Sequence, residues 1–315
     1  MRRFRLIALL PLASLLMAPR CYETRQISSP PTYKGTSHAT GGCFRDYQTV
    51  GYEPVVPDDP NKKFPLFLYF VGTDFFTGPG TYYNDGAPID IIEEMAARGF
   101  VALSVSYDNT GVALFADEAG QAQQMNCLFS EAEADSLISR ACASLAHVDC
   151  NLGIATWGHS QGGRVALRAA DFAPRDANGN SRVRAAVAFG VGPDIPAFSI
   201  DRSRVRVVDS VGDFKLPSFA PITPEDLILL TGASPPVDCA DSPDQCLRVD
   251  KSGWVLVGDD VPGIGVGHCW FMNNAACGAT LADRSSAAGF LAPNAELPYT
   301  LVANADWIQS TMGRP

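Results

Sequence analysis

A short serine motif flanked by glycines has the residue types and spacing that point most directly to chemistry. It spans Gly158–Gly162 (Gly-His-Ser-Gln-Gly), follows an apolar run that starts at Leu152, and leads into a helical pattern over residues 164–170. A tight strand-to-helix turn pushes the serine Oγ out of a sheet, and small flanking residues allow the close backbone approach that this turn needs. We therefore predict Ser160 as a nucleophile, with a glycine-rich turn carrying an ordinary exposed serine as the alternative.

This arrangement resembles the nucleophile elbow of the α/β-hydrolase family, in the manner of a secreted bacterial-type serine esterase or lipase. The resemblance covers roughly residues 64 to 312, and the motif around Ser160 is its specific part. It implies an α/β fold with a mostly parallel central sheet, helices on both faces and an insertion before the last strand. It also implies a catalytic triad in the chain order serine, acid, histidine.

The sequence offers one histidine in the position that this order requires. His268 is the only histidine after Ser160, whereas His38 and His147 precede it and His159 is fixed inside the motif, where we expect its side chain to point elsewhere. A serine hydroxyl needs such an imidazole base to act as a nucleophile near neutral pH. We predict His268 as that base, with a loop histidine of no catalytic role as the alternative.

Two aspartates compete for the role of the triad acid. Asp213 follows a predicted strand at a Gly-Asp step, where the family most often carries its acid, and Asp194 occupies the corresponding place one strand earlier. Asp209 lies within a predicted strand, which favours a structural role. We favour Asp213 and keep Asp194 as the alternative acid.

Two backbone N–H groups are predicted to form the oxyanion hole. One belongs to Gln161, directly after the nucleophile, and the other to Thr73, which follows Gly72 at the end of an apolar strand. The family's usual His-Gly pair is absent here because Val71 precedes Gly72. Gly72 as a plain strand terminator is therefore the alternative.

The resemblance implies a reaction on carboxylic esters of lipids, polyesters or polysaccharide-linked acyl groups, through an acyl-enzyme and without a metal or other cofactor. Phe75 and Trp270 lie beside the predicted oxyanion and histidine loops and are candidates for substrate binding, or else ordinary core aromatics. No Cys-x-x-Cys spacing supports a zinc site. Two alternative functions remain. One is a serine peptidase or amidase that uses the same triad, and the other is a non-catalytic hydrolase-like binding protein.

Composition and the N-terminus constrain location and partners. The formal net charge of −10 argues against a nucleic-acid partner, which would need a basic face. Residues 1–18 have the basic start and short apolar core of a secretory signal peptide, too short to span a bilayer that takes about 20 helical residues. A lipid anchor at Cys21 is disfavoured because proline and arginine precede it. We expect a secreted or periplasmic monomer without integral membrane association.

The nine cysteines fit an exported protein. If Cys21 is lost with the leader or left in a mobile N-terminus, eight remain, which allow 105 pairings. We expect three local bridges and one long-range bridge, namely Cys142–Cys150, Cys239–Cys246, Cys269–Cys277 and Cys43–Cys127.

The predicted elements divide the chain into an extended lead-in over residues 19–63, with an edge hairpin around Tyr47 to Val56, and a hydrolase domain over residues 64–315. An unbroken apolar run predicts a strand buried on both faces at Pro65–Val71, and further strands are predicted at Phe100–Tyr107, Val183–Val191, Val205–Val211 and Trp254–Gly258. Helical spacing predicts helices: Ile89–Arg98, Glu131–Ala146 and Tyr299–Met312. Residues 108–129 are expected as a connection. Residues 214–250 are expected as an insertion without regular periodicity, which is either functional or a cap over the site.

Overall fold

The computed structural model describes residues 22–37, 41–74, 80, 82–84, 86–193, 195, 197–215, 220–234, 245–258, 267–268, 271 and 289–313. The predicted signal peptide and Cys21 lie outside the described residues. No described helix is both long and apolar enough to cross a membrane.

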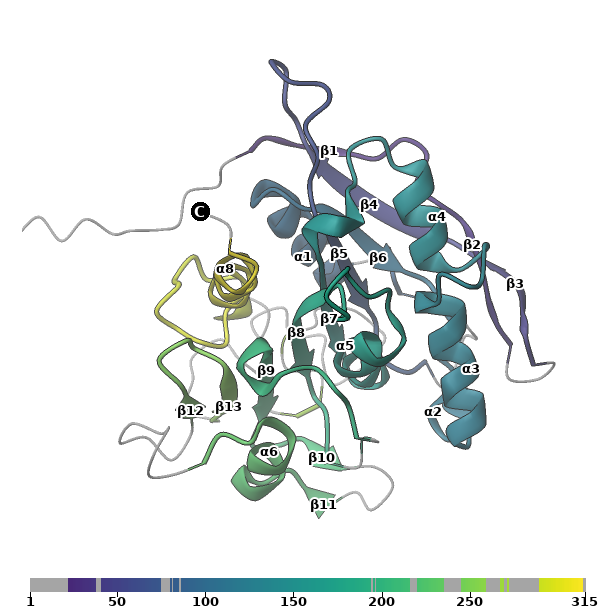
Figure 1. The fold of residues 1–315 in the computed structure, drawn as a ribbon. Helices are drawn as coiled ribbons and strands as arrows, with labels where there is room; N and C mark the ends of the chain where they lie inside the picture. Colours follow the sequence, from purple (N-terminus) through teal and green to yellow (C-terminus); the bar gives the residue numbers. More distant parts are fainter. Residues whose placement is uncertain are drawn as a thin grey trace, which may run out of the picture.

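The described chain is built on a sheet with the strand order β1-β4-β6-β5-β7-β8-β9-β13-β12 (Figure 1). The six strands from β6 to β13 are parallel to one another, and β1, β4 and β12 add antiparallel pairs at the two sides. The strands are β1 (Thr24–Gln26), β4 (Thr49–Pro54), β5 (Leu66–Phe70), β6 (Val101–Val105), β7 (Ile154–His159), β8 (Val183–Phe189), β9 (Val205–Ser210), β12 (Gln245–Leu247) and β13 (Gly253–Val257). Every residue of β5 and β6 is buried, as a parallel sheet covered on both faces requires.

Helices cover both faces of this sheet. Helix α1 contacts α8 on one face, whereas α3, α4 and α5 lie on the other (Figure 1). The helices are α1 (Gly86–Ala97), α2 (Gly111–Leu114), α3 (Glu118–Phe129), α4 (Leu137–Ser144), α5 (Gln161–Phe172), α6 (Pro224–Thr231) and α8 (Leu301–Thr311), with short 3₁₀ turns η1 (Cys150–Leu152) and η2 (Arg202–Arg204). The predicted mostly parallel sheet with helices on both faces is confirmed.

Two smaller ladders complete the described strands. Strand β2 (Tyr33–Thr36) pairs with β3 (Cys43–Tyr47), and β10 (Phe214–Lys215) pairs with β11 (Ala220–Pro221). The predicted edge hairpin around Tyr47 to Val56 is wrong, because β4 pairs with β6 on one side and with β1 on the other. The lead-in therefore contributes two strands to the central sheet.

The connection over residues 108–129 contains the helix α3, which the sequence prediction missed. The Asp117 side chain accepts a hydrogen bond from Gly120 N and starts this helix, whose first two turns are mostly small and polar. Such a composition has no clear apolar stripe, so periodicity does not reveal the helix.

The predicted helix Glu131–Ala146 is shorter than expected. Helix α4 begins only after Ser136, whose side chain accepts a hydrogen bond from Ser139 N, and the residues before it form turns. The cap defines the start of the helix more sharply than the apolar spacing does.

The segment 214–250 also has more regular structure than expected. Helix α6 starts with a capping box between Thr223 and Asp226 and ends at Gly232, whose φ is 67°. Strand β12 then joins the sheet antiparallel to β13. Part of this insertion is therefore the edge of the central sheet, and residues 216–219 and 235–244 lie outside the described residues.

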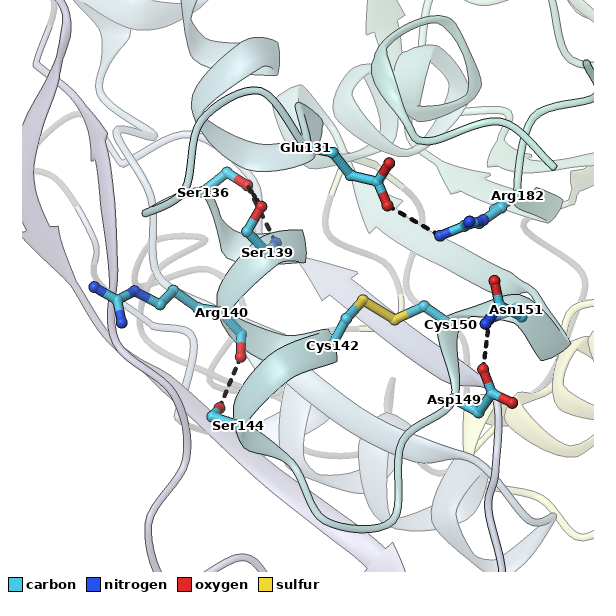
Figure 2. The surroundings of a disulfide bond; sticks show 10 residues. All are labelled: Glu131, Ser136, Ser139, Arg140, Cys142, Ser144, Asp149, Cys150, Asn151 and Arg182. Atoms are coloured by element: carbon cyan, nitrogen blue, oxygen red, sulfur yellow. Dashed lines mark hydrogen bonds and ion pairs between the residues drawn. A yellow bond between two sulfur atoms is a disulfide. The ribbon is translucent and has the colours of Figure 1, made fainter. Parts of the chain in front are cut away.

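Two of the expected disulfides are confirmed. Cys43 is bonded to Cys127, and Cys142 is bonded to Cys150. Figure 2 shows the second bond joining α4 to η1, beside the ion pair of Glu131 with Arg182. Cys246 is also disulfide-bonded.

The two remaining expected disulfides involve cysteines outside the described residues. Cys239, Cys269 and Cys277 lie outside the described residues. The Cys239–Cys246 and Cys269–Cys277 pairings remain predictions.

The two disulfides should differ in what they contribute to stability. Cys43 and Cys127 are separated by 84 residues and Cys142 and Cys150 by 8, so closing the longer loop removes more entropy from the unfolded chain. Loop-closure entropy predicts a loss of about 4.5 kcal/mol for Cys43→Ala/Cys127→Ala and of about 2.5 kcal/mol for Cys142→Ala/Cys150→Ala. Urea denaturation of both double variants measures the difference, and equal losses would contradict this ranking.

Candidate active site

Ser160 occupies a backbone conformation that residues other than glycine rarely adopt. It lies between β7 and α5 with φ 54° and ψ −120°, and its side chain does not cap the helix. A non-glycine residue held in such a sparsely populated region costs of order 1–3 kcal/mol, which the surrounding structure must offset. Ser160 therefore stands at a strained strand-to-helix turn, the backbone feature by which a nucleophile elbow is recognised.

The glycines of the motif are there because no side chain fits. A Cβ atom on Gly158 would lie 2.1 Å from the carbonyl oxygen of Gly162, and one on Gly162 would lie 2.1 Å from the carbonyl oxygen of Phe70. Both contacts are to backbone atoms, which have no rotamer to move away. Helix α5 can therefore start directly against β5 and β7 only with glycine at both positions.

Asp213 and His268 form a hydrogen-bonded pair. The distance between Asp213 Oδ1 and His268 Nδ1 is 2.7 Å, and the Asp213 side chain is fully buried whereas 21% of the His268 side chain is exposed. Phe214 N also donates to Asp213 Oδ1, and the Phe214 ring lies 5.1 Å from the His268 ring. The pair leaves His268 Nε2 as the nitrogen not engaged by the acid.

The protonation state of Asp213 is set by two opposing effects. Burial by itself raises the pKa of Asp213, but the hydrogen bond and the positive charge available on His268 lower the pKa below its usual value. Asp213 is therefore a carboxylate that can stabilise an imidazolium.

A second carboxyl group lies behind this pair. Asp209 is fully buried, and its oxygens accept hydrogen bonds from Ser210 N and Val191 N. Burial and the neighbouring charge of Asp213 raise the pKa of Asp209 well above its usual value. Asp209 therefore binds a proton more readily than Asp213 does, because two neighbouring carboxylates repel each other. Asp194, the alternative triad acid, lies outside the described residues.

The loop after β5 lies against the nucleophile turn. A Cβ atom on Gly72 would lie 3.2 Å from Ser160 Cβ, and Thr73 Oγ1 donates to Gln161 Oε1 at 3.1 Å. The Gln161 N–H has no intrahelical acceptor because it is at the start of α5. The Thr73 N–H makes no hydrogen bond within the described part of the chain. The two residues predicted for the oxyanion hole are therefore in direct contact.

Asn109 holds this loop in place and was missed by the sequence analysis. Asn109 is fully buried, and its side-chain Nδ2 donates to the Gly72 carbonyl at 2.8 Å. Its backbone carbonyl accepts a hydrogen bond from Asp74 N at 2.8 Å. Its Oδ1 accepts from Gly80 N at 2.9 Å, so one side chain joins both ends of the loop. A lone asparagine in a connection carries no signal of such a role in the sequence.

His159 does not point away from the site, contrary to expectation. Its ring is 3% exposed and lies 4.7 Å from the His268 ring, with Nε2 2.7 Å from the His268 carbonyl oxygen. Burial, followed by the nearby His268, lowers the pKa of His159 to about 3. This imidazole is therefore neutral throughout the physiological pH range.

Other predicted residues fall outside the described part. Phe75 and Trp270, the candidates for substrate binding, lie there, as does His38. His147 is remote from Ser160 and His268, and its ring nitrogens contact Glu53 and the Pro60 carbonyl.

Ser160 Oγ makes no hydrogen bond within the described part of the chain. The described residues contain no group of three histidine, cysteine, aspartate or glutamate side chains placed to hold a metal ion.

A shallow, solvent-open hollow of about 20 Å³ lies beside the turn, between α2, α3 and α5. Its apolar wall includes Leu114, Met125 and Val165, and its polar wall includes Gln161 and Arg168. Gln161 thus borders both the oxyanion loop and this hollow.

Ser160 follows a central parallel strand, Asp213 follows β9, and His268 comes after β13, so the three lie beyond the carboxyl ends of the sheet strands. The strand order and the strained serine turn together define the architecture. This is an α/β-hydrolase fold.

No protein-family model matches the chain, and no curated protein matches it either. Solved structures are similar over most of their length. An esterase of Rhizomucor miehei is 11% identical with a TM-score of 0.45, covering 94% of this chain and 87% of that one. Esterase 2 of Thermogutta terrifontis is 15% identical with a TM-score of 0.47, covering 90% and 96%. A ferulic acid esterase of Anaeromyces mucronatus is 17% identical with a TM-score of 0.46, covering 93% and 91%.

The buried, neutral His159 should make native stability fall with acidification. In the unfolded chain its pKa is about 6.5, so between pH 6.5 and the native pKa of about 3 the unfolded state binds a proton that the native state excludes. The stability is complete above pH 6.5 and declines below it by up to about 1.4 kcal/mol per pH unit. His159→Gln removes this component, so the stability difference between wild type and variant should shrink from pH 7 to pH 4. Urea denaturation from pH 4 to pH 7 measures the free energy of unfolding of both proteins. A difference between wild type and variant that stays constant with pH would contradict the prediction.

Proposed function

We propose that this protein is a serine hydrolase that cleaves carboxylic esters through an acyl-enzyme. One observation carries the proposal: the strained Ser160 turn lies beside a hydrogen-bonded Asp213–His268 pair at the carboxyl ends of one sheet. His159, the residue next to Ser160, contacts the His268 carbonyl and thereby connects the turn to the pair. Strained serines and paired acid and base side chains are the parts that acyl transfer uses.

The first half of the reaction forms the acyl-enzyme. His268 Nε2 takes the proton of Ser160 Oγ as that oxygen attacks the ester carbonyl carbon, and the Thr73 and Gln161 N–H groups donate to the oxyanion. The alcohol leaves with the proton from His268. Asp213 orients the ring through Nδ1 and stabilises the imidazolium. The contact between Ser160 and His268 closes in the substrate complex, as catalytic hydrogen bonds often do.

The second half releases the acid by the same groups. Water gives a proton to His268 as it attacks the acyl carbon, and Ser160 recovers its proton when the intermediate collapses. These steps need only the side chains and backbone groups named here. In this proposal an ester bond is cleaved and no redox change occurs.

We infer that the protein acts outside the cytoplasm. The Cys43–Cys127 and Cys142–Cys150 bonds support an oxidising compartment. The signal-peptide pattern of residues 1–18 supports export. Mass spectrometry of the mature protein from the culture medium or periplasm tests this, and a chain that retains residues 1–18 in the cytoplasm would contradict it.

Replacing the nucleophile should abolish ester turnover. Ser160→Ala is expected to lower kcat on p-nitrophenyl butyrate by about 10⁴-fold or more, because no other group can form the acyl-enzyme. A fluorophosphonate probe should label the wild type at Ser160 and leave the variant unlabelled. Ser203→Ala, on the exposed turn η2, is the control and should retain full activity.

The outcomes separate the candidate functions. Full activity in Ser160→Ala would remove Ser160 as the nucleophile. Faster turnover of amides than of matched esters by the wild type would favour a peptidase, and a folded wild type that neither labels nor turns over either substrate would favour a binding protein.

We further propose that the hollow beside Gln161 receives the acyl chain. Its apolar side chains lie next to the residue whose N–H would bind the oxyanion, which is where an acyl group must begin. Met125 is buried and lines this hollow, whereas Leu128, three residues later on α3, is equally buried and does not line it. The two residues therefore offer a matched pair of substitutions.

Met125→Ala should shift chain-length preference. Enlarging the hollow is expected to raise the ratio of kcat/KM for p-nitrophenyl octanoate over butyrate by about tenfold. Leu128→Ala should lose a similar amount of stability, about 2–5 kcal/mol, without changing that ratio. An unchanged ratio in Met125→Ala would place the acyl chain elsewhere.

A further inference from the structure

His159 is the buried group nearest to the proposed base that the mechanism above does not use. It is the last residue of β7 and directly precedes Ser160, so its ring has a fixed place relative to the nucleophile turn. Its Nε2 lies 2.7 Å from the carbonyl oxygen of His268. Because a carbonyl oxygen only accepts, His159 Nε2 carries the hydrogen and donates it.

The other ring nitrogen identifies the tautomer. His159 Nδ1 is buried and has no hydrogen-bond partner within the described part of the chain. The groups that can be charged near this ring are His268 and Asp213, and burial together with His268 holds the pKa of His159 at about 3. The proton therefore resides on Nε2 and the ring is neutral.

The ring has little freedom to rotate. Phe271 meets it edge-on with centroids 4.9 Å apart. A Cβ atom on Gly72 would lie 2.7 Å from His159 Nδ1, and one on Gly190, whose φ is 61°, would lie 3.0 Å from His159 Cδ2. Two glycines and an aromatic ring thus enclose the imidazole and aim its Nε2 at His268.

His268 is consequently held at two points. Asp213 binds its side chain through Nδ1, and His159 binds its backbone through the carbonyl oxygen. The backbone just before His268 is also held, because Ser210 Oγ donates to the Gly267 carbonyl and accepts from Gly267 N, both at 3.0 Å. The bond from His159 adds a direct link between the His268 carbonyl and the residue next to the nucleophile.

We propose that His159 is a positioning residue that keeps the proposed base His268 in register with Ser160 by donating a hydrogen bond to the His268 carbonyl. This inference rests on the proposed function. His159 does not touch the substrate and does not exchange a proton. It acts through the distance between Ser160 Oγ and His268 Nε2, on which proton transfer depends steeply.

Two substitutions separate the hydrogen bond from the bulk of the ring. His159→Phe keeps an aromatic ring and removes the donor, whereas His159→Gln keeps a donor nitrogen at a similar distance from the backbone. On p-nitrophenyl butyrate, His159→Phe is expected to lower kcat by about 10- to 100-fold with KM nearly unchanged, and His159→Gln should recover most of the loss. Titration of active sites with a fluorophosphonate corrects each rate for the fraction of folded enzyme.

A second measurement does not depend on catalysis. Hydrogen–deuterium exchange in peptides that contain His268 should be faster in His159→Phe than in wild type and close to wild type in His159→Gln. A merely structural role would lower the melting temperature in both variants and leave kcat per titrated site unchanged. Unchanged kcat per titrated site in His159→Phe would overturn the inference, whatever the exchange rate.

The two hypotheses fail in different ways. If wild type neither hydrolyses esters nor reacts with the fluorophosphonate, the proposed function fails, and exchange in the His268 peptides still reports whether His159 holds that backbone. If wild type is active and His159→Phe matches it in kcat, the positioning role fails and the serine hydrolase stands.

Discussion

The site depends on one strained turn held at the centre of the sheet. Ser160 keeps a positive φ because the elements around it leave no room to relax: α5 starts against the backbones of β5 and β7, with glycine at the two closest contacts. Strand β7 lies between β5 and β8, paired in parallel on both sides. The burial of these strands offsets a strain of a few kcal/mol at the Ser160 turn.

The same crowding determines what surrounds the turn. The loop after β5 approaches closely enough for Thr73 to bond Gln161, and Asn109 joins both ends of that loop. Across from it, His159 meets the His268 carbonyl. A displacement of the turn would therefore move both the proposed oxyanion donors and the backbone of the proposed base.

Burial and close neighbours give chemically similar groups different pKa values here. Of the two carboxyls at the end of β9, burial and charge repulsion raise the pKa of Asp209, whereas the hydrogen bond with His268 lowers the pKa of Asp213 despite its burial. The imidazoles divide similarly, because His159 is enclosed and neutral while His268 is partly exposed beside its acid. Of the two imidazoles, His268 is thus the one that contacts Asp213 and that solvent reaches.

The sequence by itself predicted the strand runs and the serine turn, because each has a local pattern. It favoured Asp213 over Asp194 as the partner of His268 from the order that the family resemblance implies, but it left the disulfide pairing open. It missed α3, whose polar composition lacks an apolar stripe, and it extended α4 past the cap at Ser136. Only the tertiary structure decided the placement of β4, the hydrogen bonds of Asn109 to the loop after β5, the raised pKa of Asp209 and the direction of His159. These depend on contacts between residues far apart in the chain, whose energies no local pattern contains.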